Sequence, residues 1–157
     1  MSRAVPPIPT GADGLVQAQE QIMETTVELH NVPGTGAAMG WAGGHTVVID
    51  RPEGRAGGMG LGFSGAQMLA VAVGGCFCNS LRYAAASLDI EIDVVEVSVT
   101  VVLGGEPLVT QEARLDVHCT RTDGGDTSEL IEKTKQTCMV ANTLQRGVKL
   151  TVGTRAS

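Results

Sequence analysis

The chain has 157 residues, 43% of them hydrophobic and 18% charged, which fits one soluble globular domain with a core. Its formal net charge of -6 argues against nucleic acid and anionic membranes as partners, because both are bound mainly through basic side chains. We also identify no run of the ~18 consecutive apolar residues that a membrane span requires. The sequence therefore predicts a protein with no nucleic-acid partner and no membrane partner.

The cysteines and the N-terminus together predict a location in the cell. Four cysteines are too few for a disulfide framework in a chain of this length. The N-terminus is rich in proline and has no apolar signal segment, which predicts a cytoplasmic protein with reduced thiols. We expect residues 1–21 to be a partly disordered extension, residues 22–153 to form one domain, and residues 154–157 to be a C-terminal tail.

The first part of this domain predicts an antiparallel meander of three strands. Alternating polar and apolar residues over 23–31 predict a half-buried strand, a second strand follows over 37–41, and residues 45–50 form the third. Turn residues separate each pair of strands. The glycine-rich segment 51–62 is equally consistent with a flexible lid and with a plain spacer.

A long apolar helix is expected next. Ser64 and Gln67 have the spacing of a capping box, which predicts a helix from there to Ser87. Its residues are almost all apolar or small, so we expect it to be buried nearly all round. Gly74 and Gly75 indicate either close backbone packing or room for a ligand beside Cys76.

The second part predicts two long strands, over 92–103 and 109–120, a helix that starts near Asp126 or Thr127 and ends at Cys138, and a short strand over 148–152. The fold class is therefore α+β, with antiparallel sheets, a buried central helix and the order βββ-α-ββ-α-β. One sheet of this size covers only one face of the central helix, so we expect a homodimer that covers the other face.

Cys76 and Cys138 are the main candidates for chemistry. Cys76 lies inside the apolar helix, and Cys138 lies at the end of the charged one. Buried thiols usually serve as small hydrophobic packing groups. Two thiols beside helix breaks also suit redox chemistry, in which one attacks a substrate and the other resolves the product as a disulfide.

The other cysteines and the histidines fit packing better than metal binding. Cys78 lies about 200° around the helix from Cys76, so the two do not share one face. Cys119 continues the apolar face of its strand, while its neighbour His118 points to the opposite face. None of the three histidines has metal-like spacing to the cysteines, and we expect no metal site.

Two segments resemble a known family. The segment Ala72-Val73-Gly74-Gly75-Cys76-Phe77 is similar to the "AACF" helix of the OsmC/Ohr thiol peroxidases. The segment Cys138-Met139-Val140-Ala141-Asn142-Thr143, followed by Val148-Lys149-Leu150-Thr151-Val152, resembles that family's second motif, "CPYSNAT…VKLTV". The resemblance covers roughly residues 22–153 and includes the order of the predicted elements.

The resemblance implies an intertwined homodimer with two active sites at its interface and with no metal or organic cofactor. Cys76 would attack a small organic hydroperoxide and become a sulfenic acid, and Cys138 would condense with it to a disulfide. A dithiol reductant such as lipoamide would then restore the thiols. We expect Trp41 and Phe77 to line an apolar substrate pocket.

The chain departs from the family pattern at both groups that assist the attacking cysteine. Ala66 stands where the family has a glutamate, and no Arg or Lys occurs between Arg3 and Arg51. Two interpretations remain. Either Arg51 or Arg55, with Glu53, reaches in from the glycine-rich segment, or these residues form a solvated turn. The alternative function is a catalytically altered OsmC-like dimer that binds a small apolar ligand and has no peroxidase activity.

Overall fold

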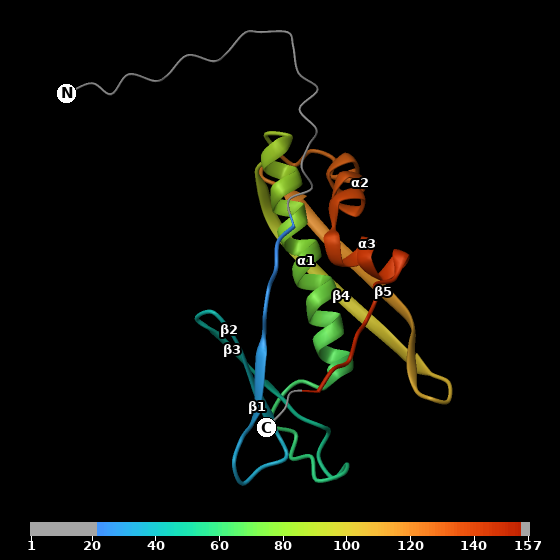
Figure 1. The fold of residues 1–157 in the computed structure, drawn as a ribbon. Coiled ribbons are helices and arrows are strands. Elements are labelled where there is room, and N and C mark those ends of the chain that lie inside the picture. Colours follow the sequence, from blue (N-terminus) through green and yellow to red (C-terminus); the bar gives the residue numbers. More distant parts are fainter. Residues whose placement is uncertain (1–21, 155–157) are drawn as a thin grey trace, which may run out of the picture.

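Two antiparallel sheets and three helices make up the computed structural model of the chain, which describes residues 22–154 (Figure 1). In chain order the elements are β1 (Glu28–Asn31), β2 (Ala38–Ala42), β3 (His45–Ile49), α1 (Gly65–Ser87), β4 (Ile92–Gly104), β5 (Val109–Arg121), α2 (Ser128–Thr137) and α3 (Met139–Arg146). The α+β class and the antiparallel sheets are confirmed. The extension predicted over residues 1–21 lies outside the described residues, as does most of the predicted tail.

The meander of β1, β2 and β3 forms as predicted, in the order β1-β2-β3, except at its start. The first strand begins at Glu28 and not at Met23, because β2 offers partners only from Glu28 to Asn31. Gly40 sits in the middle of the sheet, opposite Leu29 and Val47. A Cβ there would lie 3.2 Å from a methyl of Val47, so glycine allows the side chains beside it to pack closely.

The glycine-rich segment that follows β3 is held in place by one buried carboxylate. Asp50 is 5% exposed, and its Oδ2 accepts hydrogen bonds from the amides of Met59 and Leu61 at 3.0 and 3.1 Å. Its Oδ1 accepts from the amide of Arg51 at 2.7 Å. Of the two interpretations of this segment, these hydrogen bonds favour a plain spacer over a flexible lid.

Helix α1 starts where the sequence predicts. Ser64 Oγ accepts from the Gln67 amide at 3.3 Å, and Gln67 Oε1 accepts from the Ser64 amide at 2.8 Å, so the capping box is complete. The expected burial all round the helix is wrong for the single chain. The residues buried are Val73, Phe77, Ser80, Leu81, Ala84 and Ala85. Val71 and Tyr83 are exposed, because the chain's other elements leave that part of α1 uncovered.

By length and composition, α1 also meets the criteria for a membrane span, with a mean hydropathy of 1.2 over its most apolar 18 residues. The prediction that no such segment exists was therefore too strict. The central helix of a soluble protein has the same composition, because its apolar side chains pack against other elements. In this chain α1 packs against β4, β5, α2 and α3, which is the position of a core helix.

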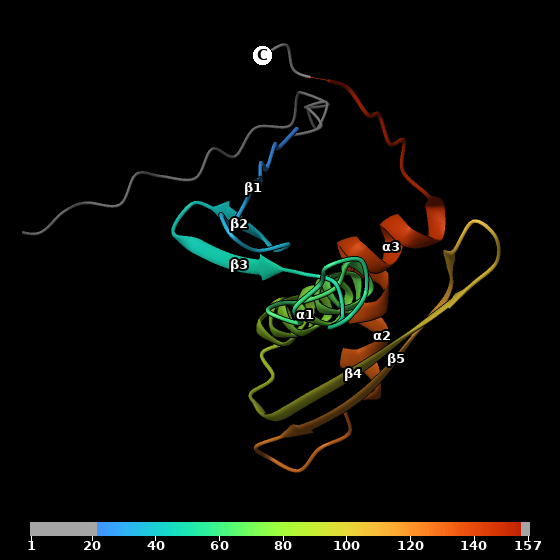
Figure 2. The ribbon, with the colours of Figure 1, turned by 90° about the horizontal axis from the view of Figure 1, so that it is seen from below.

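Strands β4 and β5 form a long antiparallel hairpin that packs along α1, and Figure 2 shows α1 between this hairpin and the small sheet. Helix α2 packs on α1 beside the hairpin. The core is centred on Phe77, Leu81, Leu130, Cys119 and Cys138. The prediction that Cys119 is a packing residue is therefore confirmed.

The C-terminal segment differs from its prediction. Residues 148–152 form no strand, and Val148, Leu150 and Val152 are 76%, 84% and 87% exposed. Alternating residues favour an extended chain, but a strand also requires hydrogen-bonded neighbours. Within residues 22–154 no sheet edge pairs with this segment, so the predicted closing strand is absent from the single chain.

Candidate active site at the corner between α2 and α3

The two candidate thiols meet where α1 packs against the corner between α2 and α3. Cys76 lies in the middle of α1, and Cys138 is the residue between the two shorter helices. The amide of Val140 donates a hydrogen bond to Cys76 Sγ at 3.5 Å. The Cys138 thiol lies close enough to interact with that of Cys76, and both are free thiols. The structure therefore brings together two residues that lie 62 positions apart in the chain.

The environments of the two sulfurs differ. Cys138 is completely buried, and this burial is the main reason that the pKa of its thiol is raised. The neighbouring Cys76 thiol raises that pKa as well, while the Ala141 amide and the Ser80 hydroxyl partly oppose the shift. Cys138 is therefore a neutral thiol at neutral pH. Cys76 is only partly buried and has an amide donor at its sulfur.

The corner that carries Cys138 is built by hydrogen bonds on both sides of a helix break. The backbone of Cys138 is extended, with φ -66 and ψ 107, so α2 ends before it and α3 begins after it. Its amide donates to Thr134 O at 2.9 Å, and its carbonyl accepts from the amide of Asn142 at 3.0 Å. The side chain of Asn142 donates to Gln136 O and to Cys138 O at 3.0 and 2.9 Å.

Helix α3 was not predicted from the sequence. Val140 and Leu144 have the spacing of one helix face, and Gly147 follows the last residue with a positive φ of 76. These signals are weak because the helix has only eight residues. The missed helix matters here because its first turn carries the amide that reaches Cys76.

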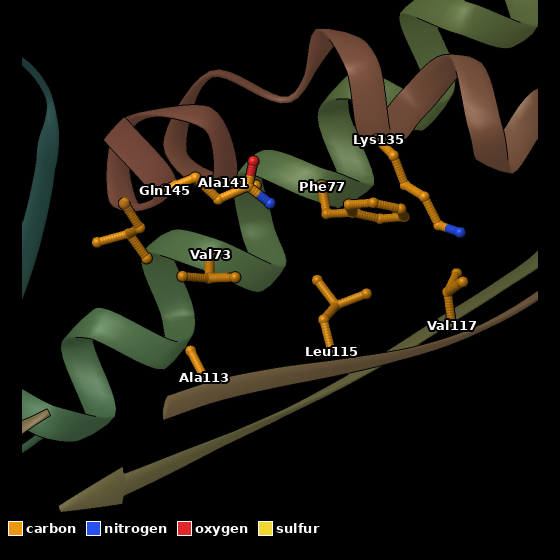
Figure 3. A pocket seen from close by; sticks show the side chains of 9 residues that line it. Val73, Phe77, Ala113, Leu115, Val117, Lys135, Ala141 and Gln145 are labelled. Atoms are coloured by element: carbon orange, nitrogen blue, oxygen red, sulfur yellow. The ribbon is translucent and has the colours of Figure 1, made fainter. Parts of the chain in front are cut away.

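An apolar cavity of about 430 Å³ lies between α1, β5 and the two short helices (Figure 3). Its lining consists of Val73, Phe77, Ala113, Leu115, Val117, Lys135, Ala141, Leu144 and Gln145. Neither Cys76 nor Cys138 lines it, but Phe77 follows Cys76 directly in α1, and Ala141 follows Val140 in α3. Trp41 lies elsewhere, in β2, where its ring packs against His30 with centroids 5.7 Å apart.

The charged residues of the glycine-rich segment lie away from the thiols of their own chain. Arg51 donates from Nη2 to Gly36 O at 3.1 Å, and Glu53 and Arg55 are exposed. This segment leads into the start of α1, whereas Cys76 comes twelve residues after the capping Ser64, about 18 Å along the helix. Within one chain the structure therefore does not bring these three residues to Cys76.

The remaining thiols face other surroundings. Cys78 lines a shallow hollow between α1 and β4, on a different side of the helix from the corner. Cys119 is buried, which raises the pKa of its thiol, although the charge of Arg82 partly opposes the shift. Across residues 22–154, no three His, Cys, Asp or Glu side chains gather in a way that would hold a metal ion.

A family model described as OsmC-like protein matches residues 57–153, which is more than half of the chain and includes both thiols. The chain belongs to the OsmC family. The resemblance of its two cysteine motifs to this family is thereby confirmed. A comparison with curated proteins gave no match.

Several solved structures of OsmC-like proteins share this fold. An OsmC-like protein from Mycoplasma pneumoniae is 19% identical with a TM-score of 0.64, over 81% of this chain and 89% of that one. The organic hydroperoxide resistance protein OsmC from Legionella pneumophila is 21% identical with a TM-score of 0.59, over 80% and 92%. An organic hydroperoxide resistance protein from Elizabethkingia anophelis is 18% identical with a TM-score of 0.60, over 81% and 91%. At these identities the similarity shows the fold alone.

Proposed function

We propose that this OsmC-family protein is a thiol-dependent peroxidase that reduces small organic hydroperoxides through Cys76 and Cys138. The observation that carries the proposal is the meeting of these two thiols at the corner between α2 and α3. An apolar cavity lined by Phe77, the residue after Cys76, supports it. Two solved structures with the same fold are described as organic hydroperoxide resistance proteins, which supports the same class of substrate.

The chemistry starts at Cys76. Its thiolate attacks the terminal oxygen of the hydroperoxide, the O–O bond breaks, and the remaining alkoxide takes up a proton and leaves as an alcohol. The substrate gains two electrons, and Cys76 becomes a sulfenic acid. The sulfur of Cys138 then attacks that of Cys76, an S–S bond forms, and the hydroxyl group leaves as water with the Cys138 proton. A dithiol reductant of the lipoamide class reduces this disulfide by exchange.

The surroundings of each thiol support this division of roles. A nucleophile must be accessible and must be able to carry negative charge, and Cys76 is partly exposed with an amide at its sulfur. Cys138 is buried and neutral, so it is protected from peroxide until a sulfenic acid forms next to it. The steps require no metal and no organic cofactor.

The proposal includes a homodimer in the reducing cytoplasm, where four free thiols remain reduced. Exposed apolar side chains on α1, on β1 and over 148–152 support a second copy of the chain as the partner. In such a dimer Arg51, Glu53, Arg55 or Trp41 of one chain would assist the thiols of the other.

A second candidate function is the binding of a small apolar ligand without peroxidase activity. The cavity favours it, because its walls are apolar apart from Lys135 and Gln145. The absence of any Arg or Lys from residue 56 to residue 81 favours it as well, since α1 carries no cation from its start through Leu81.

The test is the consumption of cumene hydroperoxide by the reduced protein with dihydrolipoamide, run beside Cys76→Ser, Cys138→Ser and, as a matched control, Cys78→Ser. We expect turnover in the wild type and in Cys78→Ser, and none in the other two variants. Wild-type protein that leaves the peroxide and its own thiols unchanged would reject the peroxidase and leave ligand binding as the function to test.

A further inference from the structure

The side chain of Asn142 joins the two helices that flank Cys138. Its Nδ2 donates to Gln136 O in the last turn of α2 at 3.0 Å, and to Cys138 O at 2.9 Å. Carbonyls at the end of a helix have no partner within it, so a side-chain donor there satisfies a group that the fold leaves open. Asn142 therefore closes the corner from the α3 side.

The geometry of this corner determines two contacts of the thiol pair. Cys138 is the corner residue, so the corner sets where its sulfur lies relative to that of Cys76. Val140 is the second residue of α3, and its amide has no intrahelical partner because of that position. That amide donates to Cys76 Sγ instead, at 3.5 Å.

The contact between this amide and Cys76 matters because α1 supplies no positive charge there. Residues 56–81 contain no charged side chain, and Arg51 of the same chain donates to Gly36 O. An amide at a helix N-terminus stabilises negative charge, both as a hydrogen-bond donor and through the helix dipole. The negative charge of a Cys76 thiolate is thus stabilised by the Val140 amide, and the position of that amide depends on the corner.

We propose that Asn142 is a positioning residue for the thiol pair. By bonding to Gln136 O and Cys138 O, it holds the corner so that the Val140 amide stabilises the Cys76 thiolate and the Cys138 sulfur stays within reach. The inference rests on the proposed function only in that Cys76 is the nucleophile; the contacts themselves are independent of the substrate.

The test measures the alkylation rate of each cysteine by iodoacetamide in the reduced full-length protein, by peptide mass, from pH 6 to pH 10. In Asn142→Ala we expect Cys76 to react about fivefold more slowly at pH 7, and its rate to level off at a higher pH. A loss of packing alone would not move this pH profile. Thr143→Ala is the matched control, because Thr143 is the next residue of α3 and its side chain makes no hydrogen bond within residues 22–154. We expect its rates to stay within about twofold of the wild type.

A second pair of variants tests the amide directly. Val140→Pro removes the N–H group that donates to Cys76 Sγ, and it removes no hydrogen bond within α3, because that amide has no intrahelical acceptor. We expect about tenfold slower alkylation of Cys76 in Val140→Pro, and little change in the control Met139→Pro, whose amide does not contact the sulfur. Unfolding of Asn142→Ala would be seen as rapid alkylation of all four cysteines. In that case this second pair of variants decides whether the Val140 amide stabilises the Cys76 thiolate.

The outcomes separate the inference from the proposed function. Two results would overturn the inference even if the wild type turns over peroxide. One is a folded Asn142→Ala variant whose Cys76 is alkylated at the wild-type rate. The other is an equal rate of Cys76 alkylation in Val140→Pro and Met139→Pro. The expected slowing, found in a protein that consumes no peroxide, would support the inference and reject the peroxidase.

Discussion

At the scale of single residues, two cysteines of one site have opposite surroundings. Cys138 is completely buried, and its thiol has a raised pKa. Cys76 is partly exposed, and its sulfur accepts a hydrogen bond from a helix amide. A negative sulfur is disfavoured by burial in apolar surroundings and favoured by a donor. The proposed division of labour between the two thiols therefore follows from their environments.

This difference predicts unequal labelling of the reduced wild-type protein. At pH 7 we expect iodoacetamide to modify Cys76 at least about tenfold faster than Cys138. The pKa of Cys138 lies above its usual value of 9.0. The difference between the two alkylation rates should therefore narrow only in strongly alkaline solution. Peptide mass spectrometry of timed samples measures both rates. Equal rates at neutral pH would contradict the assignment of Cys76 as the nucleophile.

Asp50 predicts a dependence of stability on pH. Hydrogen bonds from the amides of Leu61 and Met59 are the main reasons that the pKa of this carboxyl is lowered. A lowered pKa in the folded state stabilises the protein above the unfolded value of about 3.9, and this contribution is lost as the pH falls through the lower folded value. We therefore expect Asp50→Asn to melt about 5 °C below the wild type at pH 7.

The same two proteins, melted between pH 2 and pH 7, provide the check on Asp50. The difference in melting temperature should stay constant above about pH 5 and shrink below about pH 4. Asp116→Asn is a suitable control, because that aspartate is exposed on β5 and makes no side-chain hydrogen bond among residues 22–154. A difference in melting temperature between Asp50→Asn and the wild type that does not change with pH would contradict a stabilising role for the Asp50 charge.

At the scale of elements, the start of α1 places the helix that carries Cys76. The capping box at Ser64 ends the glycine-rich segment and begins the helix, and Phe63 pairs with Ile49 just before it. The chain therefore enters α1 from a fixed point on β3. The register of the helix, and with it the side on which Cys76 faces the corner, follows from this start.

Removal of the cap should destabilise this element measurably. We expect Ser64→Ala to lower the free energy of unfolding by about 1 kcal/mol, because the Gln67 amide loses its acceptor. Ser64→Asp keeps an acceptor at the cap and should stay close to the wild type. Urea unfolding followed by circular dichroism measures all three proteins. A Ser64→Ala variant as stable as the wild type would show that the cap contributes little.

At the scale of the whole molecule, the single chain leaves much apolar surface uncovered. Leu29 on β1 is 54% exposed, Tyr83 on α1 is 78% exposed, and Leu150 near the C-terminus is 84% exposed. Apolar side chains exposed on several elements favour a protein partner, because large apolar patches mark interaction sites. In the proposed homodimer, a second copy of the chain covers these surfaces and offers residues 148–152 the strand partner that they lack among residues 22–154.

The proposed homodimer predicts a mass in solution of about twice 16.2 kDa, measured by light scattering on a sizing column. Leu150→Asp should raise the dimer dissociation constant about tenfold or more, because it places a charge on the covered surface. Lys149→Ala, at the neighbouring exposed position, should leave the constant unchanged. A monomeric wild type at micromolar concentration would contradict the dimer.

Much of the fold was predictable because its signals are local. Alternating residues mark β4 and β5, and the Ser64–Gln67 spacing marks the start of α1. The predictions that failed depended on partners. Residues 23–27 and 148–152 have the pattern of strands but no neighbouring strand among residues 22–154, and α3 is too short for its pattern to stand out.

The sequence by itself determined the fold class, the family and the two thiols of interest, because these depend on residue types at short spacings. Only the tertiary structure decided which groups surround each thiol. Packing joins Cys76 to the amide of Val140, 64 residues away, and directs Arg51 to Gly36. Such contacts arise when separate elements pack together, and the free energy of that packing is shared among many residues of the core.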